Sequence, residues 1–182
     1  MIATHAEAAA RNQVSRLAGV ADQQIGGQSA LTTDFIGLLG EVAFSIFFDC
    51  ERDSDVSVRS GSIDFISNGK AVEVKSSKYP NAHLLVPSYE IGGKTTTKEY
   101  CDAYVLMLVD IDARTVTFAG WAERDELINP RTLEYFRNSS RLSFVLPQDA
   151  LHQLDEYTAG WIVAAAKAKG HNVSLTSDGP VV

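Results

Sequence analysis

The sequence has little cysteine, and this excludes two classes of site. Cys50 and Cys101 are the only cysteines, and they form no Cys-x-x-Cys pattern. Such usage favours reduced thiols in the cytoplasm over a disulfide framework or a zinc site. The four histidines are scattered along the chain and predict no ligand cluster: His5, His83, His152 and His171.

Long apolar runs and a leader pattern are also lacking. No apolar run approaches the length of a membrane span, and the N-terminus has no basic segment followed by an apolar one. We therefore expect a cytoplasmic protein with no membrane partner. The 182 residues are 45% hydrophobic and show no linker or repeat, so they suit one domain, 1–182, with a full-sized core.

Two helices are expected before the first clear strand. Residues 3–19 are rich in alanine and predict an N-terminal helix. A second helix should run from about Ser29 or Thr33 to Phe48, with Thr33 or Asp34 as its cap. Its apolar stripe has helical spacing and is expected to face the core: Phe35, Leu38, Leu39, Val42, Ala43, Ile46 and Phe47.

The rest of the chain predicts a small twisted sheet flanked by further helices. Strands are expected at 56–58, at 103–109 (buried on both faces), at 115–121 and, as an edge strand, at 142–146. Residues 78–100 read mostly as loop with one short helix, and 123–129 and 131–139 as short helices. A helical region is expected at 147–169, followed by a mobile tail at 170–182.

The stretch Gly61–Ser77, GSIDFISNGKAVEVKSS, predicts a hairpin. Asn68-Gly69 is a strong signal for a two-residue turn, because both turn positions need positive φ. The resulting register pairs Ser67 with Lys70, Ile66 with Ala71, Phe65 with Val72 and Asp64 with Glu73. Ile63, Phe65, Val72 and Val74 then share a core-facing side of the ribbon, and Asp64, Glu73 and Lys75 share the other.

The pairing of Asp64 with Glu73 points to chemistry. Directly opposed side chains have Cβ atoms roughly 4.5–5.5 Å apart, where like charges destabilise a sheet. A divalent cation between the carboxylates would account for the pair. The alternative is an exposed hairpin with a different turn, on which Lys75 is only a salt-bridge partner.

The distribution of charge is more informative than its total of −7, which argues weakly against nucleic acid. Between Lys70 and Lys98 five lysines face two glutamates, so this window carries +3 and the remainder of the chain −10. A basic rim beside a carboxylate pair suits phosphate. Lysines that decorate an exposed loop would give the same count.

Glu41 lies on the polar shoulder of the second helix, where Gly37 and Gly40 would permit close approach. Glu41 on a helix, Asp64 on a strand and Glu73-Val74-Lys75 on the next strand resemble the signature of the PD-(D/E)xK nuclease superfamily. The resemblance covers about 33–109, with Ile63 where the motif's name has proline. It implies a restriction-endonuclease-like α/β/α core, about 33–122, and a metal-dependent deoxyribonuclease, an endonuclease of bacterial or phage type.

The resemblance also implies the roles of the residues. The catalytic residues would be Glu41, Asp64, Glu73 and Lys75. The cation would be Mg²⁺ or Mn²⁺, which prefer oxygen ligands, and its ligands would be Asp64, Glu73 and the Val74 backbone carbonyl. Glu41 would add a further ligand, either directly or through water. Lys75 would orient the attacking water. The residues downstream that could touch phosphate, or be ordinary polar surface, are Ser76, Ser77, Lys78, His83, Lys94 and Lys98.

Two other functions are compatible with the sequence. The chain could be a non-catalytic nucleic-acid-binding or assembly protein that retains the nuclease fold, although such a protein has no need of the carboxylates. It could also be a metal-dependent hydrolase of another phosphoester. DNA is the expected partner, and a homodimer, the DNA structure recognised, endo- or exonuclease action and the number of metals stay open.

Overall fold

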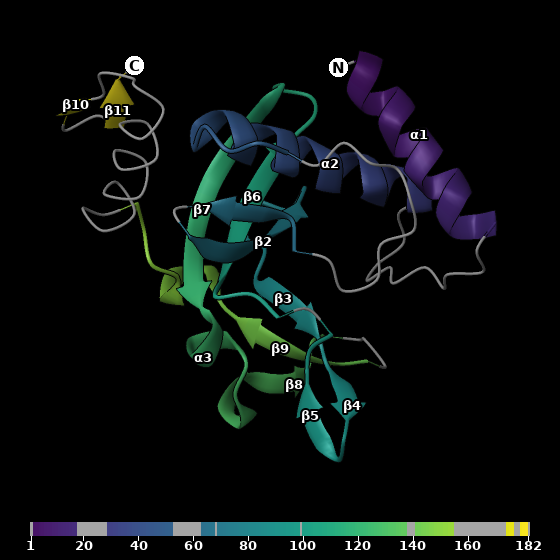
Figure 1. Ribbon diagram of the computed structural model, residues 1–182, viewed down its shortest axis with the longest axis vertical. Helices are drawn as coiled ribbons and strands as arrows, with labels where there is room; N and C mark the ends of the chain where they lie inside the picture. The colour runs from purple at the N-terminus through teal and green to yellow at the C-terminus, as the bar shows by residue number, and fades with distance from the viewer. Residues whose placement is uncertain are drawn as a thin grey trace.

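The computed structural model describes residues 2–17, 29–52, 63–67, 69–98, 100–137, 141–154, 174–176 and 179–181. In this part of the chain, helices α1 (Ile2–Leu17) and α2 (Ala30–Phe47) lie beside a four-stranded sheet (Figure 1). The strands of this central sheet follow the order β1 (Phe65–Ser67), β2 (Lys70–Ser77), β6 (Ala103–Asp110) and β7 (Thr115–Glu123). β2 and β6 are parallel and the other neighbours antiparallel, which confirms a mixed sheet in an α/β protein.

The hairpin of β1 and β2 has the predicted register. Its Cα partners are Phe65 and Val72, Ile66 and Ala71, and Ser67 and Lys70. Gly69 supplies the positive φ, 77°, that the tight turn requires. Ile63 is a correction: it packs in the cluster on the opposite face from Phe65. Since β1 begins only at Phe65, the alternation of a strand does not extend back to Ile63.

The start of α2 agrees with Ser29, one of the two start positions that the sequence predicted. Ser29 is the N-cap, and its Oγ accepts a hydrogen bond from the Thr32 N–H at 3.2 Å. Thr33 and Asp34 were wrong as caps, because both lie inside the helix. Asp34 instead accepts a hydrogen bond from Asn12 Nδ2 of α1 at 2.9 Å, which helps to join the two helices.

The core-facing side of α2 differs from the predicted stripe. Its buried residues are Ile36, Leu38, Gly40 and Phe44. Ile46 is 76% exposed and Phe47 43% exposed, so both were assigned wrongly to the core. The helix is apolar on most of its surface, and periodicity alone therefore could not orient it. The contact of Gly40 with Ser76 of β2 orients α2, because an added Cβ at Gly40 would stand 1.9 Å from the Ser76 Oγ.

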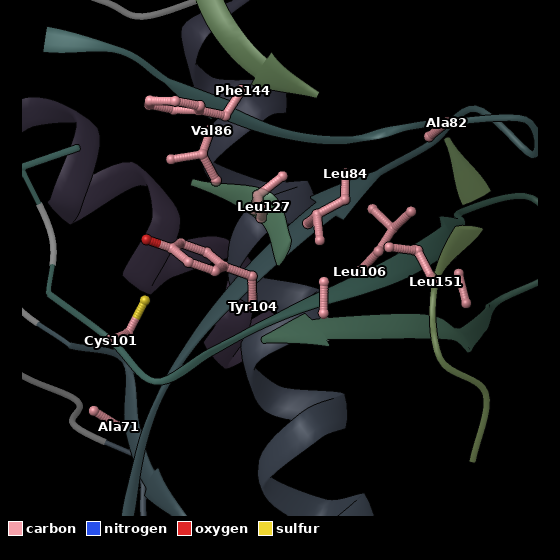
Figure 2. Close-up of a cluster of buried hydrophobic side chains, with 12 residues drawn as sticks. Ala71, Ala82, Leu84, Val86, Cys101, Tyr104, Leu106, Leu127, Phe144 and Leu151 are labelled. Atoms are coloured by element: carbon pink, nitrogen blue, oxygen red, sulfur yellow. The ribbon is translucent and has the colours of Figure 1, made fainter. Parts of the chain in front are cut away.

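The two faces of the central sheet are covered differently. Phe44 and Phe48 pack with Phe65, Val72 and Val74 on the face toward α2. The opposite face is covered by a second sheet, β3 (Leu84–Pro87), β9 (Leu142–Leu146) and β8 (Leu133–Tyr135) in that order. Figure 2 shows the core between the sheets, in which Leu84, Val86 and Phe144 meet Tyr104 and Leu106. In the described residues the layers are thus helix, sheet and sheet, where helices had been expected on both faces.

The second sheet corrects three other predictions. The described part of residues 78–100 holds no helix, so the short helix expected there was wrong; between loops it contains β3 and the hairpin of β4 (Tyr89–Ile91) and β5 (Lys94–Thr96), whose turn is Gly92-Gly93 with φ of 61° and 74°. β9 is a central strand and not an edge. The predicted helix at 131–139 is a 3-10 turn (Pro130–Thr132) followed by β8, because residues 133–135 pair with β9. The short helix predicted at 123–129 is confirmed as α3 (Arg124–Leu127).

The predictions for the chain ends are only partly testable. The strand at 56–58 and most of the helical region at 147–169 lie outside the described residues; Gln148–Ala150 form a 3-10 turn. β10 (Ser174–Thr176) and β11 (Gly179–Val181) pair antiparallel, so this part of the predicted mobile tail is a hairpin.

α2 meets the length and hydropathy of a membrane span, with 18 residues of mean hydropathy 1.5. This corrects the expectation that no apolar run approaches such a span. Composition alone is weak evidence, because the core helix of a globular protein passes the same test. α2 lies between α1 and the central sheet and places Phe44 and Phe48 in the core, while 22% of the helix is buried.

Candidate functional site

Asp64 lies just beyond the end of the β1–β2 ladder. β1 pairs only with residues 70–72 of β2, so the ladder ends one pair before Asp64 and Glu73. At this point a side chain replaces the backbone acceptor of a paired strand: the Asp64 Oδ2 accepts a hydrogen bond from the Val74 N–H at 2.8 Å. The predicted neighbourhood of Asp64 is therefore present, with a backbone contact to Val74 in place of a regular pair with Glu73.

Val74 turns its side chain and its backbone in different directions. The side chain is 7% exposed and belongs to the core beneath α2. In an extended strand the N–H and C=O of one residue point to the same edge. Since the Val74 N–H points to Asp64, its carbonyl oxygen faces the same edge of β2, beside the carboxylate with which it was expected to act.

Glu73 and Lys75 occupy alternate positions of β2 and share the other face of the strand. Glu73 is only 6% exposed, and Lys75 Nζ lies 2.6 Å from its Oε1. An ion pair of this kind is unusual in a sheet core, since burial penalises the charged forms of both groups. The shared face was predicted, whereas the ion pair is the contact that the structural alternative expected of Lys75.

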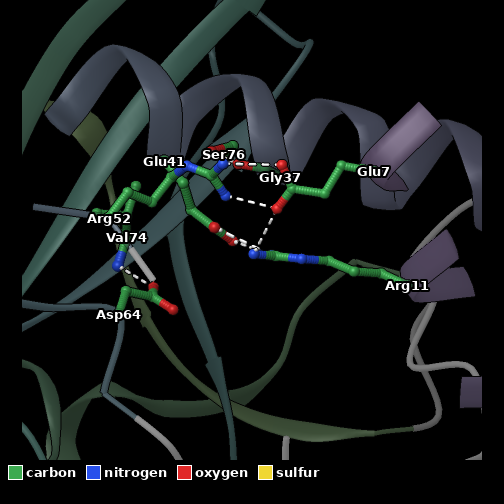
Figure 3. A network of polar contacts seen from close by, with 8 residues as sticks. All are labelled: Glu7, Arg11, Gly37, Glu41, Arg52, Asp64, Val74 and Ser76. Atoms are coloured by element: carbon green, nitrogen blue, oxygen red, sulfur yellow. Dashed lines mark hydrogen bonds and ion pairs between the residues drawn. The ribbon is translucent and has the colours of Figure 1, made fainter. Parts of the chain in front are cut away.

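Glu41 belongs to a network of charged side chains that joins α1 to α2 (Figure 3). Arg11 Nη1 donates to both Glu41 oxygens, at 3.2 and 3.0 Å, and Arg11 Nη2 lies 3.0 Å from Glu7 Oε1. Arg52 holds Glu7 through two parallel hydrogen bonds of 2.6 and 2.8 Å. The four side chains are only 16–19% exposed, so solvent screens these contacts less than it would at the surface.

The pKa of Asp64 reflects the burial of this side chain and the charges around it. Burial, followed by the charges of Glu73 and Glu41, raises the pKa of Asp64 from 3.8 to about 8. The Val74 N–H and the Lys75 ammonium act in the opposite direction without cancelling the shift. Two consequences follow: Glu41, Glu73 and Lys75 all lie close enough to influence Asp64, and without a cation Asp64 holds a proton at neutral pH.

The residues fit a hard cation with few protein ligands. No group of three or more His, Cys, Asp or Glu side chains gathers as a metal cage in the described part of the chain. Mg²⁺ does not demand one, because it keeps several waters and binds through one or two carboxylates plus substrate phosphate. Asp64, Glu73 and the Val74 carbonyl can supply that set. Glu41 is engaged by Arg11, so it fits better as a ligand through water than as a direct one.

Ser76 and Ser77, predicted to contact phosphate, make contacts within the protein. The Ser76 hydroxyl lies under α2 and donates to the Gly37 carbonyl at 3.5 Å. Ser77 Oγ accepts from the Tyr79 N–H at 3.2 Å in the turn after β2. Both serines therefore have structural roles near the site.

The other four candidates lie beyond β2, toward the second sheet. Lys78 is exposed beside Tyr79, and His83 packs on Phe136 with ring centroids 4.8 Å apart. Lys94 and Lys98 lie on and just after β5, both exposed. The structure thus brings Glu41, Asp64, Glu73 and Lys75 together and separates them from this second, basic region.

Glu7 and Arg11 were missed because the N-terminal helix was given no role except packing, and Arg52, which follows α2, was given no role at all. One signal was available: Glu7 and Arg11 have the i, i+4 spacing of a helical ion pair on an otherwise alanine-rich helix. The contact of Arg11 with Glu41 is long-range, and no local pattern encodes it.

Cys101 offers no competing chemistry at neutral pH. Neither cysteine forms a disulfide, and Cys101 is fully buried. Burial raises the pKa of the Cys101 thiol to about 12. A thiol that stays protonated is a poor nucleophile and a poor metal ligand.

No family model matches this chain, and comparisons with curated proteins and with solved structures find no significant match. The functional argument therefore depends on the residues of the site.

Proposed function

We propose that this protein is a cytoplasmic, divalent-metal-dependent nuclease that hydrolyses DNA phosphodiester bonds. One observation carries the proposal. The Asp64 carboxylate accepts a hydrogen bond at 2.8 Å from the N–H of Val74, the residue between Glu73 and Lys75 in the sequence, and Glu73 and Lys75 form an ion pair at 2.6 Å. A hairpin that served structure alone would seldom gather two acids and a lysine at one partly buried edge, because like charges repel and burial penalises the charged forms.

The side chains have complementary tasks in such a reaction. Asp64 and Glu73 provide the negative charge that retains a cation at the edge of β2, together with the Val74 carbonyl. Lys75 forms an ion pair with Glu73. Its ammonium group could then donate to an oxygen of a phosphate bound at the edge of β2, or orient the attacking water. When bound, Mg²⁺ or Mn²⁺ would neutralise charge on the phosphate and make its water more acidic.

The nature of the ligands favours a phosphate substrate. Carboxylate and carbonyl oxygens suit Mg²⁺ and Mn²⁺ rather than zinc. These ions complete their coordination with waters and substrate oxygens, so a site with few protein ligands needs an anionic substrate. DNA satisfies this requirement, and the lysines and arginines in the segments that flank the second sheet give it a further surface to contact.

A cleavage assay tests the proposal. Wild-type protein should cut one or more of single-stranded, duplex, nicked and branched DNA with Mg²⁺ or Mn²⁺, and EDTA should stop the reaction. Asp64→Asn should be inactive, because a neutral amide keeps the hydrogen bond from Val74 and loses the charge. Asp112→Asn is the matched control, since this exposed acid lies in the turn between β6 and β7.

Two outcomes would overturn the proposal. Cleavage that persists in EDTA would exclude the metal mechanism, and an active Asp64→Asn protein would exclude this site. Binding of DNA without cleavage of any substrate would favour the non-catalytic alternative. The engagement of Glu41 by Arg11 is the one observation that supports that alternative, since it occupies a side chain expected to serve the cation.

A further inference from the structure

The second sheet and the β4–β5 hairpin carry a cluster of cations around aromatic rings. Lys98 Nζ lies 4.4 Å from the ring centre of Tyr89, and Arg141 Cζ lies 4.8 Å from the same centre. Lys98 follows β5 and Arg141 precedes β9, so residues far apart in sequence converge on one ring. We call Tyr89, Lys98 and Arg141 the Tyr89 cluster.

More aromatic and basic side chains lie near this cluster. Tyr135 of β8 pairs with Leu142, the neighbour of Arg141, and its side chain is 62% exposed. Phe136 follows and carries Arg137 over its ring at 5.0 Å. The end of the β8–β9 ladder therefore continues the pattern of the Tyr89 cluster, with an aromatic ring open to solvent beside it.

The charge of this region opposes that of the whole chain. In residues 78–98 and 129–150, six lysines and arginines face three acids, in a protein of net charge −7. One of the acids, Glu90, accepts a hydrogen bond from Thr95. Such a positive region attracts a polyanion, while the remaining surface repels it.

We infer that the Tyr89 cluster and Tyr135 form a binding surface for single-stranded DNA. Cations alone would suit any polyanion, including an acidic protein. The exposed ring of Tyr135 next to those cations adds stacking, and only unpaired bases present their faces for it. The inference deepens the proposed nuclease function, on which it depends for its substrate: it assigns the enzyme DNA that has a single-stranded segment.

Binding measured in EDTA tests the surface without cleavage. Fluorescence anisotropy of a labelled oligothymidine and of a duplex of equal length should show tighter binding of the single strand by the full-length wild-type protein. Lys98→Gln and Arg141→Gln should each weaken single-strand binding several-fold and reduce the slope of log affinity against log salt by about one. Arg114→Gln, in the β6–β7 turn, is the control with equal loss of charge and should bind like wild type.

The aromatic ring has its own pair of variants. Tyr135→Leu should lower single-strand affinity by about tenfold and leave duplex affinity unchanged, because it removes a stacking face and no charge. Tyr135→Phe should retain wild-type binding. Tyr135 is exposed, so neither variant should disturb folding, and melting curves check this.

Other results would overturn the inference. Lys98→Gln and Arg141→Gln proteins that bind like Arg114→Gln would place the strand elsewhere. Equal binding of the single strand and of polyglutamate would indicate an acidic protein partner. The two proposals fail separately: a wild-type protein that cleaves DNA while Tyr135→Leu binds normally refutes only the surface, and one that binds single strands selectively but never cleaves refutes only the nuclease.

Discussion

The guanidinium of Arg11 and the carboxylate of Glu41 form an ion pair between α1 and α2, with Nη1 3.0 Å from Oε2 and 3.2 Å from Oε1. The pair brings a cation of the N-terminal helix to an acid that also acts on Asp64. Arg11 therefore has two effects: it joins the helices, and it neutralises part of the charge that would attract a metal ion.

Removal of Arg11 should separate these effects. Arg11→Gln should lower the melting temperature of the metal-free protein, because the contact between the helices is weakened. It should also bind Mn²⁺ several-fold more tightly in calorimetric titration, because the positive charge near the site is gone. Arg52→Gln is the control: it weakens the hold on Glu7 and leaves Arg11 on Glu41, so Mn²⁺ affinity should not change. Equal affinities in all three proteins would show that Glu41 contributes nothing to metal binding.

Lys75 is expected to matter for both stability and chemistry. Lys75→Met should abolish cleavage and cost roughly 1–3 kcal/mol of unfolding free energy, since it takes an ion pair from the buried Glu73. Adding Glu73→Gln should recover much of that stability, because no buried charge is then left, and should restore no activity. Chemical denaturation and cleavage assays of the single and double variants check this. Recovery of activity in the double variant would contradict the role given to Lys75.

The packing of α2 on β2 predicts opposite results for two glycines of one helix. Gly40→Ala should destabilise by about 1–3 kcal/mol, because its Cβ would stand 1.9 Å from Ser76 Oγ and 3.3 Å from Met107 Cβ. Gly37→Ala should stabilise by about 0.5–1 kcal/mol, since it has nothing within 4 Å and alanine favours a helix. Ser76→Gly should relieve part of the cost of Gly40→Ala. Urea unfolding of the four proteins measures these differences.

Local signals account for what the sequence predicted well. The Asn-Gly turn specifies the register of the β1–β2 hairpin by itself, and this register brings Asp64 beside Glu73-Val74-Lys75. The continuous apolar run of β6 likewise marks a strand buried on both faces. Neither inference needs information about distant parts of the chain.

Long-range packing accounts for what was missed. The orientation of α2 depends on contact with Ser76, and its apolar surface concealed which side makes that contact. β8 and β9 are strands because they pair with each other and β9 with β3, although their local sequence favoured a helix and an edge. The Gly92-Gly93 turn, like the i, i+4 spacing of Glu7 and Arg11, was a local signal that was overlooked.

The last prediction concerns the pH dependence of the metal-free protein. Burial and the charges of Glu73 and Glu41 raise the pKa of Asp64 to about 8 in the folded state, against 3.8 for an ordinary aspartate. The folded protein thus holds a proton that the unfolded chain has released. The stability that Asp64 contributes is fully present below pH 3.8 and is lost as the pH rises toward 8.

Asp64→Asn should remove this dependence, because an amide resembles the protonated acid and keeps the hydrogen bond from Val74. In EDTA, its melting temperature should exceed that of wild type by a margin that grows between pH 5 and 8. Each kcal/mol of difference in unfolding free energy should correspond to about 2–4 °C. Added Mg²⁺ or Mn²⁺ should raise the melting temperature of wild type and leave Asp64→Asn nearly unchanged, since a ligand of the folded state stabilises by mass action. Thermal melts of both proteins across this pH range, with EDTA and with millimolar metal, measure both effects. Equal metal-induced shifts in the two proteins would mean that the ion binds elsewhere, and the gathering of acids at the β2 edge would then need another explanation.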